Sequence, residues 1–116
     1  MSDTECLFCK FASGEVKTDV VFETEKVFAF RDINPQAPTH ILIIPRRHIA
    51  TINDLSKSDA KLIGNLYLVA KELAKDEGFS EDGYRVVMNC NAAAGQTVFH
   101  VHLHLLGGRL FNWPPG

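Results

Sequence analysis

The sequence predicts an α+β fold in which one long helix covers one face of an antiparallel sheet. Short β-rich runs alternate with polar turns, one long segment has apolar residues at helical spacing, and the last β-rich run alternates histidine with aliphatic residues. The chain has 116 residues, of which 46% are hydrophobic and 22% are charged. This length and composition are typical of one globular domain, which we expect over residues 1–116.

Runs rich in β-branched and aromatic residues predict the strands of the sheet. They span residues 20–22, 27–30, 41–44, 84–88 and 98–105. The polar residues 24–26 predict a hairpin between the first two runs. Pro45 predicts the end of the third, because proline cannot donate a ladder hydrogen bond. Small and polar residues predict loops at 34–38 and 91–95.

Two segments predict helices. The shorter spans residues 7–12 and is closed by Gly14. The longer begins near Ser56, where Ser56 and Asp59 resemble a capping box, and ends at Gly78. Apolar residues of the longer helix recur at helical spacing and should form one buried stripe. They are Leu62, Ile63, Leu66, Val69, Ala70, Leu73 and Ala74.

The most informative run is His100-Val101-His102-Leu103-His104. Successive strand side chains point to opposite faces, so the three imidazoles are expected on one face and the aliphatic residues on the other. Imidazole can act as a nucleophile, a proton carrier or a metal ligand. The alternative is a plain solvated face, but such a face more often carries Thr, Lys and Glu. The remaining histidines, His40 and His48, flank the third strand, which supports a common site.

Charge and hydropathy exclude several classes of function. The net charge is −2 and the only basic pair, Arg46-Arg47, is expected at an exposed strand end, so no nucleic-acid partner is predicted. No apolar run is long enough to cross a membrane. The acidic start, Met1 to Glu5, lacks the parts of a signal peptide, and we expect a cytoplasmic protein.

The three cysteines do not suggest a disulfide framework in that compartment. Cys6 and Cys9 form a C-x-x-C pair that could bind zinc with two histidines. A redox pair, or one buried and one exposed thiol, are the alternatives. Cys90 is expected to be a small core residue.

The run from His100 to Leu106 resembles the signature of the histidine triad (HIT) family. The segments from Phe30 to His40, from Ile44 to Ile49 and from Gly95 to Phe99 resemble its Hint branch of nucleoside phosphoramidate hydrolases, as does the end of the chain from Gly107. The resemblance covers nearly the whole chain. It implies a five-stranded antiparallel sheet with one long helix and a short N-terminal helix. It also implies a homodimer with a continuous ten-stranded sheet, in which Trp113 reaches towards the partner's active site.

The resemblance also implies a reaction. Family members cleave the bond between phosphorus and nitrogen in adenosine phosphoramidates and aminoacyl adenylates, releasing AMP. His102 would attack phosphorus and form a covalent nucleotidyl-histidine, which suits an imidazole because it is also a good leaving group. The implied supporting groups are the other triad histidines, His40, Thr97 near the leaving amine, and polar phosphate contacts. These residues are His100, His104, His40, Thr97, Asn89 and Gln96.

The implied nucleotide pocket joins an acid for the ribose to an apolar base site. Asp32 matches the ribose-binding carboxylate, although by itself an aspartate before Asn34-Pro35 is equally typical of a turn. The base site matches four residues that would otherwise be read as core: Phe8, Phe11, Val16 and Ile33.

Family members with a C-x-x-C pair bind zinc, which implies the ligands Cys6, Cys9, His48 and His100. Four protein ligands leave no open position, so the zinc would be structural. No organic cofactor is implied.

Three departures bear on the reaction. Thr97 and Phe99 stand where Ser and Tyr are commoner, which affects the rate more than the reaction type. His104 stands where the transferase branch has Gln, which favours hydrolysis. The alternatives are a dinucleoside polyphosphate hydrolase and a non-catalytic nucleotide-binding or interaction protein.

Overall fold

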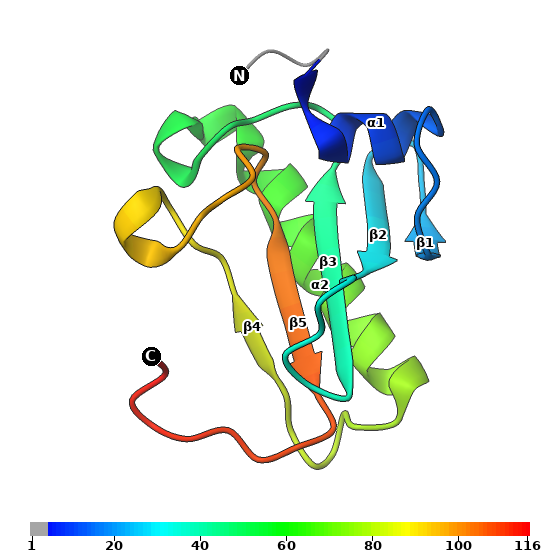
Figure 1. Ribbon diagram of the computed structural model, residues 1–116, viewed down its shortest axis with the longest axis vertical. Coiled ribbons are helices and arrows are strands. Elements are labelled where there is room, and N and C mark those ends of the chain that lie inside the picture. The colour runs from blue at the N-terminus through cyan, green and yellow to red at the C-terminus, as the bar shows by residue number, and fades with distance from the viewer. Residues whose placement is uncertain (1–4) are drawn as a thin grey trace.

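The computed structural model describes residues 5–116 as a five-stranded antiparallel sheet with a long helix on one face (Figure 1). Residues 1–4, which carry most of the acidic start considered above, lie outside the described part. The helices are α1 (Leu7–Ser13) and α2 (Ala60–Glu77). The strands are β1 (Val20–Glu23), β2 (Val27–Arg31), β3 (Thr39–Pro45), β4 (Arg85–Val87) and β5 (Leu103–Gly107).

The strand order is β1-β2-β3-β5-β4, and each neighbouring pair is antiparallel. The predicted fold class, the first hairpin and both helices are therefore confirmed. Within residues 5–116 no helix is both long and apolar enough to cross a membrane.

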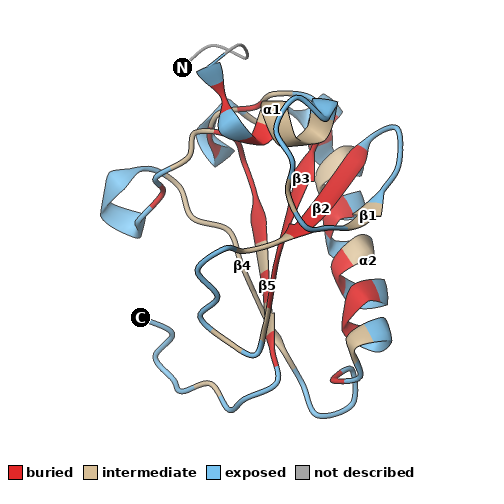
Figure 2. Cartoon of the chain, turned by 45° about the vertical axis from the view of Figure 1, so that its right-hand side comes forward, coloured by how far each residue is buried: buried red, intermediate tan, exposed pale blue. Residues whose placement is uncertain are grey.

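The main core lies between α2 and the sheet. Leu66, Ala70, Leu73 and Ala74 of the predicted stripe are buried there, with Ile63 and Val69 packed at the edge of the cluster. Figure 2 shows the buried side of α2 turned towards the strands. Leu62 is only half-buried. The stripe is the main reason why α2 stays on the sheet, because apolar burial supplies most of the stability of such a helix.

The predicted ends of α2 are also observed. The Asp59 carboxylate accepts hydrogen bonds from the Ser56 backbone N–H (2.8 Å) and hydroxyl (3.2 Å), as the capping box predicts. The helix starts slightly later than expected, because a 3-10 turn over Lys57–Asp59 precedes it. Gly78 ends it in the left-handed region with φ 88°.

The prediction of the last strand is wrong at its start. A strand was expected from residue 98, but β5 begins at Leu103 and residues 98–102 follow an irregular path. The Val101 N–H donates to the carbonyl of Ile49 (2.7 Å), which lies after the end of β3 and outside the regular ladder. The predicted alternation holds within β5, where Leu103 and Leu105 are part of the core under α2. Val101 is buried too, but so are its neighbours His100 and His102. The fourth strand, expected over 84–88, is also shorter and spans Arg85–Val87.

The other face of the sheet carries a second apolar cluster, which positions the site. It contains Cys6, Phe8, Phe28, Phe30, Leu42 and Ile44. Helix α1 lies at the end of the sheet towards which β3 runs, and Phe8 of α1 joins this cluster (Figure 1). Helix α1 ends at Gly14, which has a φ of 83°, as the sequence predicts.

Two further expectations need correction. Arg46 is not simply an exposed strand end: it is half-buried and bonded to α1 and to the β1–β2 hairpin, whereas Arg47 is exposed. Cys90 is half-buried in the segment after β4 and is not part of either core cluster.

Candidate active site and metal centre

A cavity of about 690 Å³ opens on the α1 face of the sheet. Its lining includes an aromatic group from α1 and β2 and two histidines from β5 and the residues just before it. The predicted site residues that line it are Phe8, Phe11, Asp32, Ile33, Thr97, His102 and His104. Apolar walls with a few polar groups at one end are typical of a small-molecule site.

His102 lies at the polar end with one nitrogen committed to the backbone. Its Nδ1 is 2.7 Å from the carbonyl oxygen of His100. A carbonyl can only accept, so Nδ1–H donates and the lone pair of the neutral ring is on Nε2. The side chain is only 8% exposed, and burial lowers the pKa of His102 below its ordinary value. The ring is thus held neutral, with a nucleophilic Nε2.

His104 and His40 form a hydrogen-bonded pair from neighbouring strands. The Gln36 backbone N–H donates to Nδ1 of His40 (3.0 Å), which places the His40 proton on Nε2. That proton is directed at Nδ1 of His104, 2.9 Å away, so neutral His104 carries its own proton on Nε2. Burial, assisted by the neighbouring His102 and His40, lowers the pKa of His104 to about 4. Burial also lowers the pKa of His40.

This chain of bonds makes His104 a neutral donor beside His102, whose ring centroid is 4.9 Å away. His40 is buried behind His104 and is not part of the cavity wall. Its link to the cavity is the hydrogen bond to His104, and the supporting role that the resemblance implies stays a prediction.

Asp32 follows the end of β2 and has two sets of contacts. One carboxylate oxygen accepts the Asn34 backbone N–H (2.8 Å), as expected for a turn aspartate. The other oxygen lies 3.5 Å from Nε2 of His40. The residue also lines the cavity, so the turn interpretation and the pocket interpretation are both compatible with its position.

Three predicted contacts lie elsewhere. The Gln96 carboxamide is buried: its oxygen accepts the Asn91 N–H (2.8 Å), and its nitrogen donates to the carbonyls of Ala50 (2.8 Å) and Val98 (3.1 Å). Both amide protons are used, so Gln96 holds the loop and has no donor left for phosphate. Asn89 and Val16 are absent from the cavity lining, and Val16 borders a smaller neighbouring hollow.

His100 also departs from the expected common face. Its ring is fully buried and lies outside the cavity lining, against His48 at a ring-centroid separation of 5.1 Å. Its carbonyl serves His102, while its ring belongs to the cysteine cluster.

The four ligand atoms of Cys6, Cys9, His48 and His100 all lie within 4.8 Å of one another. Nδ1 of His100 is 3.4 Å from both sulfurs, and Nδ1 of His48 is 3.4 Å from that of Cys9. Zn–S and Zn–N bonds of about 2.3 and 2.0–2.1 Å at a tetrahedral angle place sulfur and nitrogen about 3.5 Å apart. The spacing fits such an ion.

The surrounding hydrogen bonds also fit a metal. Nε2 of His100 donates to the carbonyl of Pro45 (2.7 Å), which leaves Nδ1 unprotonated towards the sulfurs. The Cys9 backbone N–H donates to the sulfur of Cys6 (3.4 Å) at the start of α1. The cluster can therefore hold a metal ion with two thiolates and two imidazoles.

Asp32, His40 and His104 form a second compact group of potential ligand atoms. A metal on Nε2 of His40 would require the proton on Nδ1, where Gln36 already donates its N–H. The tautomer that this contact selects makes the group a proton-carrying pair and disfavours a metal there.

The cavity wall also contains residues that were not predicted. They are Leu7, Lys17, Thr18, Asp19, Phe30, Arg31, Leu42 and Val98. Phe30 and Leu42 could have been found from strand alternation, because they lie on the same sheet face as Phe28 and Ile44. Residues 17–19 lie in an irregular segment whose position no periodicity predicts.

The shifted pKa of His104 predicts a pH-dependent stability. Between about 4 and the ordinary value of 6.5 the unfolded chain binds more protons at this residue than the folded protein. The free energy of unfolding should therefore fall as the pH drops through this window. The loss of stability due to His104 should be complete below a pH of about 4. Urea unfolding at several pH values should show the fall, and His104→Gln should lose less stability. An equal loss in both proteins would contradict the assignment.

Comparison with known proteins identifies the family of the chain. A sequence model of the HIT domain matches residues 13–110. A purine nucleoside phosphoramidase of Escherichia coli is 50% identical over 105 residues, which cover 90% of this chain and 88% of the relative. A 14 kDa zinc-binding protein of Zea mays is 51% identical over 119 residues, covering 100% of this chain and 91% of the relative.

Among solved structures, a HIT family hydrolase of Legionella pneumophila superposes with a TM-score of 0.95 at 60% identity, covering 97% of this chain and 100% of that one. The family model spans most of the chain, and the resemblance seen in the sequence is confirmed. The chain belongs to the HIT family.

Proposed function

We propose that the protein is a purine nucleoside phosphoramidate hydrolase that forms a covalent intermediate on His102. The observation that carries the proposal is the bond from Nδ1 of His102 to the His100 carbonyl, which leaves Nε2 as the nucleophilic nitrogen beside the cavity. The E. coli relative that is named a purine nucleoside phosphoramidase supports the reaction type.

In this mechanism Nε2 of His102 attacks the phosphorus of the substrate and forms a new P–N bond. The P–N bond to the amine breaks, and the amine leaves after gaining a proton, with the Thr97 hydroxyl placed on the cavity wall to assist. Water then attacks phosphorus, the bond to His102 breaks, and the nucleotide is released with the lone pair back on Nε2. Two displacements replace one difficult hydrolysis, which is ordinary covalent catalysis.

The neutral pair of His40 and His104 supports both displacements. Nε2–H of His104 is a preorganised donor for a phosphate oxygen, and preorganised donors stabilise charge that develops in the transition state. Asp32 would accept hydrogen bonds from ribose hydroxyls, and the aromatic wall of Phe8, Phe11 and Phe30 would hold the base.

We further propose that Cys6, Cys9, His48 and His100 hold a structural zinc ion. Zinc would supply a cross-link between the start of α1 and the segments after β3 and before β5. The donor set and the 3.4 Å spacings support zinc, as does the zinc-binding name of the maize relative. Reduced thiols are needed, so we place the protein in the cytoplasm.

A homodimer is also proposed, supported by exposed apolar groups on α2 and on the C-terminal segment. Tyr67 and Leu68 of α2 are 50% and 60% exposed, and Leu110 and Trp113 of the C-terminal segment are 92% and 83% exposed. Such groups are more typical of an interface than of a solvent face. The mass in solution measures this directly, and a monomer at working concentration would contradict it.

The reaction is tested by following AMP release from adenosine 5′-phosphoramidate and, separately, from a diadenosine polyphosphate. We expect much faster turnover of the phosphoramidate. Faster turnover of the polyphosphate would reassign the substrate class. Tight AMP binding without turnover of either compound would favour a nucleotide-binding protein.

A further inference from the structure

We propose that Arg46 is a positioning residue for the base end of the nucleotide pocket, because it holds the C-terminal end of α1 against the β1–β2 hairpin. The inference rests on the proposed function but assigns a residue outside the cavity and outside the metal cluster.

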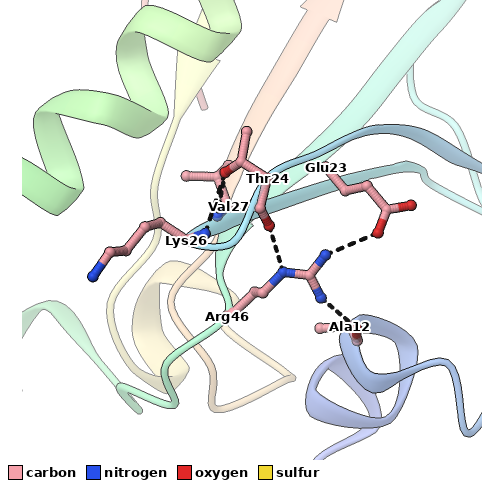
Figure 3. Close-up of polar contacts among 6 residues, drawn as sticks. All are labelled: Ala12, Glu23, Thr24, Lys26, Val27 and Arg46. Carbon is pink, nitrogen blue, oxygen red and sulfur yellow. Dashed lines mark hydrogen bonds and ion pairs between the residues drawn. The ribbon is translucent and has the colours of Figure 1, made fainter.

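Arg46 uses its whole guanidinium group to join three segments (Figure 3). Its Nε donates to the carbonyl of Thr24 (2.6 Å), and one terminal nitrogen donates to the carboxylate of Glu23 (2.9 Å). The other terminal nitrogen donates to the carbonyl of Ala12 in α1 (2.5 Å). The group also lies over the ring of Phe28, 5.3 Å from its centroid. The planar fork of arginine suits such a junction better than a lysine ammonium.

The bond to Ala12 meets a specific need of α1. The last carbonyls of a helix have no partner within the helix and carry partial negative charge, which a cation stabilises. A helix of seven residues is also far too short to be stable by itself in water. Its position therefore depends on its attachments, which are the packing of its aromatic rings, the Cys6 and Cys9 cluster at its start and Arg46 at its end.

Helix α1 supplies two aromatic rings of the cavity. Phe8 and Phe11 pack edge-on against Phe30 of β2, with ring centroids 5.2 and 5.1 Å away. Phe11 directly precedes Ala12, so release of the clamp should displace Phe11 first. The aromatic wall for the base would then be looser, and substrate binding should weaken.

The nucleophile should be much less affected. His102 is oriented by its own bond to the His100 carbonyl, and the anchor at the start of α1 remains intact when Arg46 is replaced. The expected signature is therefore a raised KM with nearly unchanged kcat, which marks weaker binding in ground and transition states alike.

The experiment compares Arg46→Met and Arg46→Lys with Arg47→Met. Arg47 is a matched control: it is the adjacent arginine, but it pairs with Asp59 at the start of α2. We expect Arg46→Met to raise KM for adenosine 5′-phosphoramidate about fivefold or more, because a charge-assisted clamp is lost. The expected change in kcat is within about twofold, and Arg46→Lys should show a smaller rise in KM. Arg47→Met should leave KM unchanged.

A ribose 5-phosphoramidate without a base gives a second control, since it cannot contact Phe8 or Phe11. Its KM should not respond to Arg46→Met. An unchanged nucleoside KM in Arg46→Met, an equal rise in Arg47→Met, or an equal rise for the baseless substrate would each overturn the inference. If Arg46→Met does not fold, as judged by circular dichroism, Arg46→Lys carries the same comparisons.

Failure of the proposed function can be told apart from failure of this inference. If the unmodified protein hydrolyses neither adenosine 5′-phosphoramidate nor the diadenosine polyphosphate, the proposed function fails. The variants are then compared by their affinity for AMP, measured by calorimetry, in place of KM. Weaker AMP binding in Arg46→Met than in Arg47→Met would then support the clamp, and equal binding would overturn it.

Discussion

Replacement of His102 by alanine is expected to lower turnover of adenosine 5′-phosphoramidate by about 10⁴-fold or more, because the covalent route is lost with its nucleophile. Nε2 of His102 is the lone-pair nitrogen that the His100 carbonyl selects. The neighbouring His104 carries its proton on Nε2 and cannot take over the attack in its neutral tautomer.

The substitution should impair the chemical step and leave nucleotide binding nearly unchanged. AMP affinity should stay within about an order of magnitude, since Asp32, Phe8 and Phe11 remain in place. The bond from phosphorus to a histidine nitrogen hydrolyses in acid, so the reaction is quenched with denaturant at alkaline pH. Intact-mass analysis should then show a nucleotidyl adduct on the unmodified protein and none on His102→Ala. Substantial turnover by His102→Ala, or an adduct on another residue, would contradict the proposed mechanism.

Disruption of the Cys/His cluster is expected to have the largest effect on stability. Structural zinc sites contribute binding free energies of about 10–16 kcal/mol to folding in small domains, so even a fraction of this is a large share of the stability of one domain. Metal analysis should find about one zinc per chain. Cys9→Ser, or removal of the metal with a chelator, should lower Tm by about 10 °C or more.

Cys90→Ser is the matched control, because Cys90 is a half-buried thiol outside the cluster. It should keep both the zinc and most of the Tm. Turnover should fall with Cys9→Ser as well, since the ring of His100 is held in the cluster while its carbonyl orients His102. Zinc-free protein with an unchanged Tm would show that the cluster acts as a set of hydrogen-bonded thiols.

The elements with strong local patterns could be predicted from the sequence. The stripe from Leu66 to Ala74, the Ser56–Asp59 cap and the glycines that end both helices follow from periodicity and backbone preference, which are properties of neighbouring residues. The predicted strand start at residue 98 is wrong because it too rests on a pattern of neighbouring residues, whereas strand pairing depends on a distant segment. Apolar and histidine residues alternate from Phe99 to Leu105, but the Val101 N–H is bonded to Ile49 outside the ladder.

By itself, the sequence determined the fold class and the long helix. Through its resemblance to a family, it also predicted many of the residues that line the cavity and all four of the Cys/His cluster. The tertiary structure alone decided what each polar atom does there. The Pro45 carbonyl selects the tautomer of His100, and the Gln36 N–H selects that of His40. The Gln96 carboxamide donates to the carbonyls of Ala50 and Val98 and accepts the Asn91 N–H, and no local pattern predicts these partners. The physical reason is that periodicity reports which face a side chain occupies, whereas a proton's position depends on the acceptor or donor within about 3 Å, which mostly comes from a distant part of the chain.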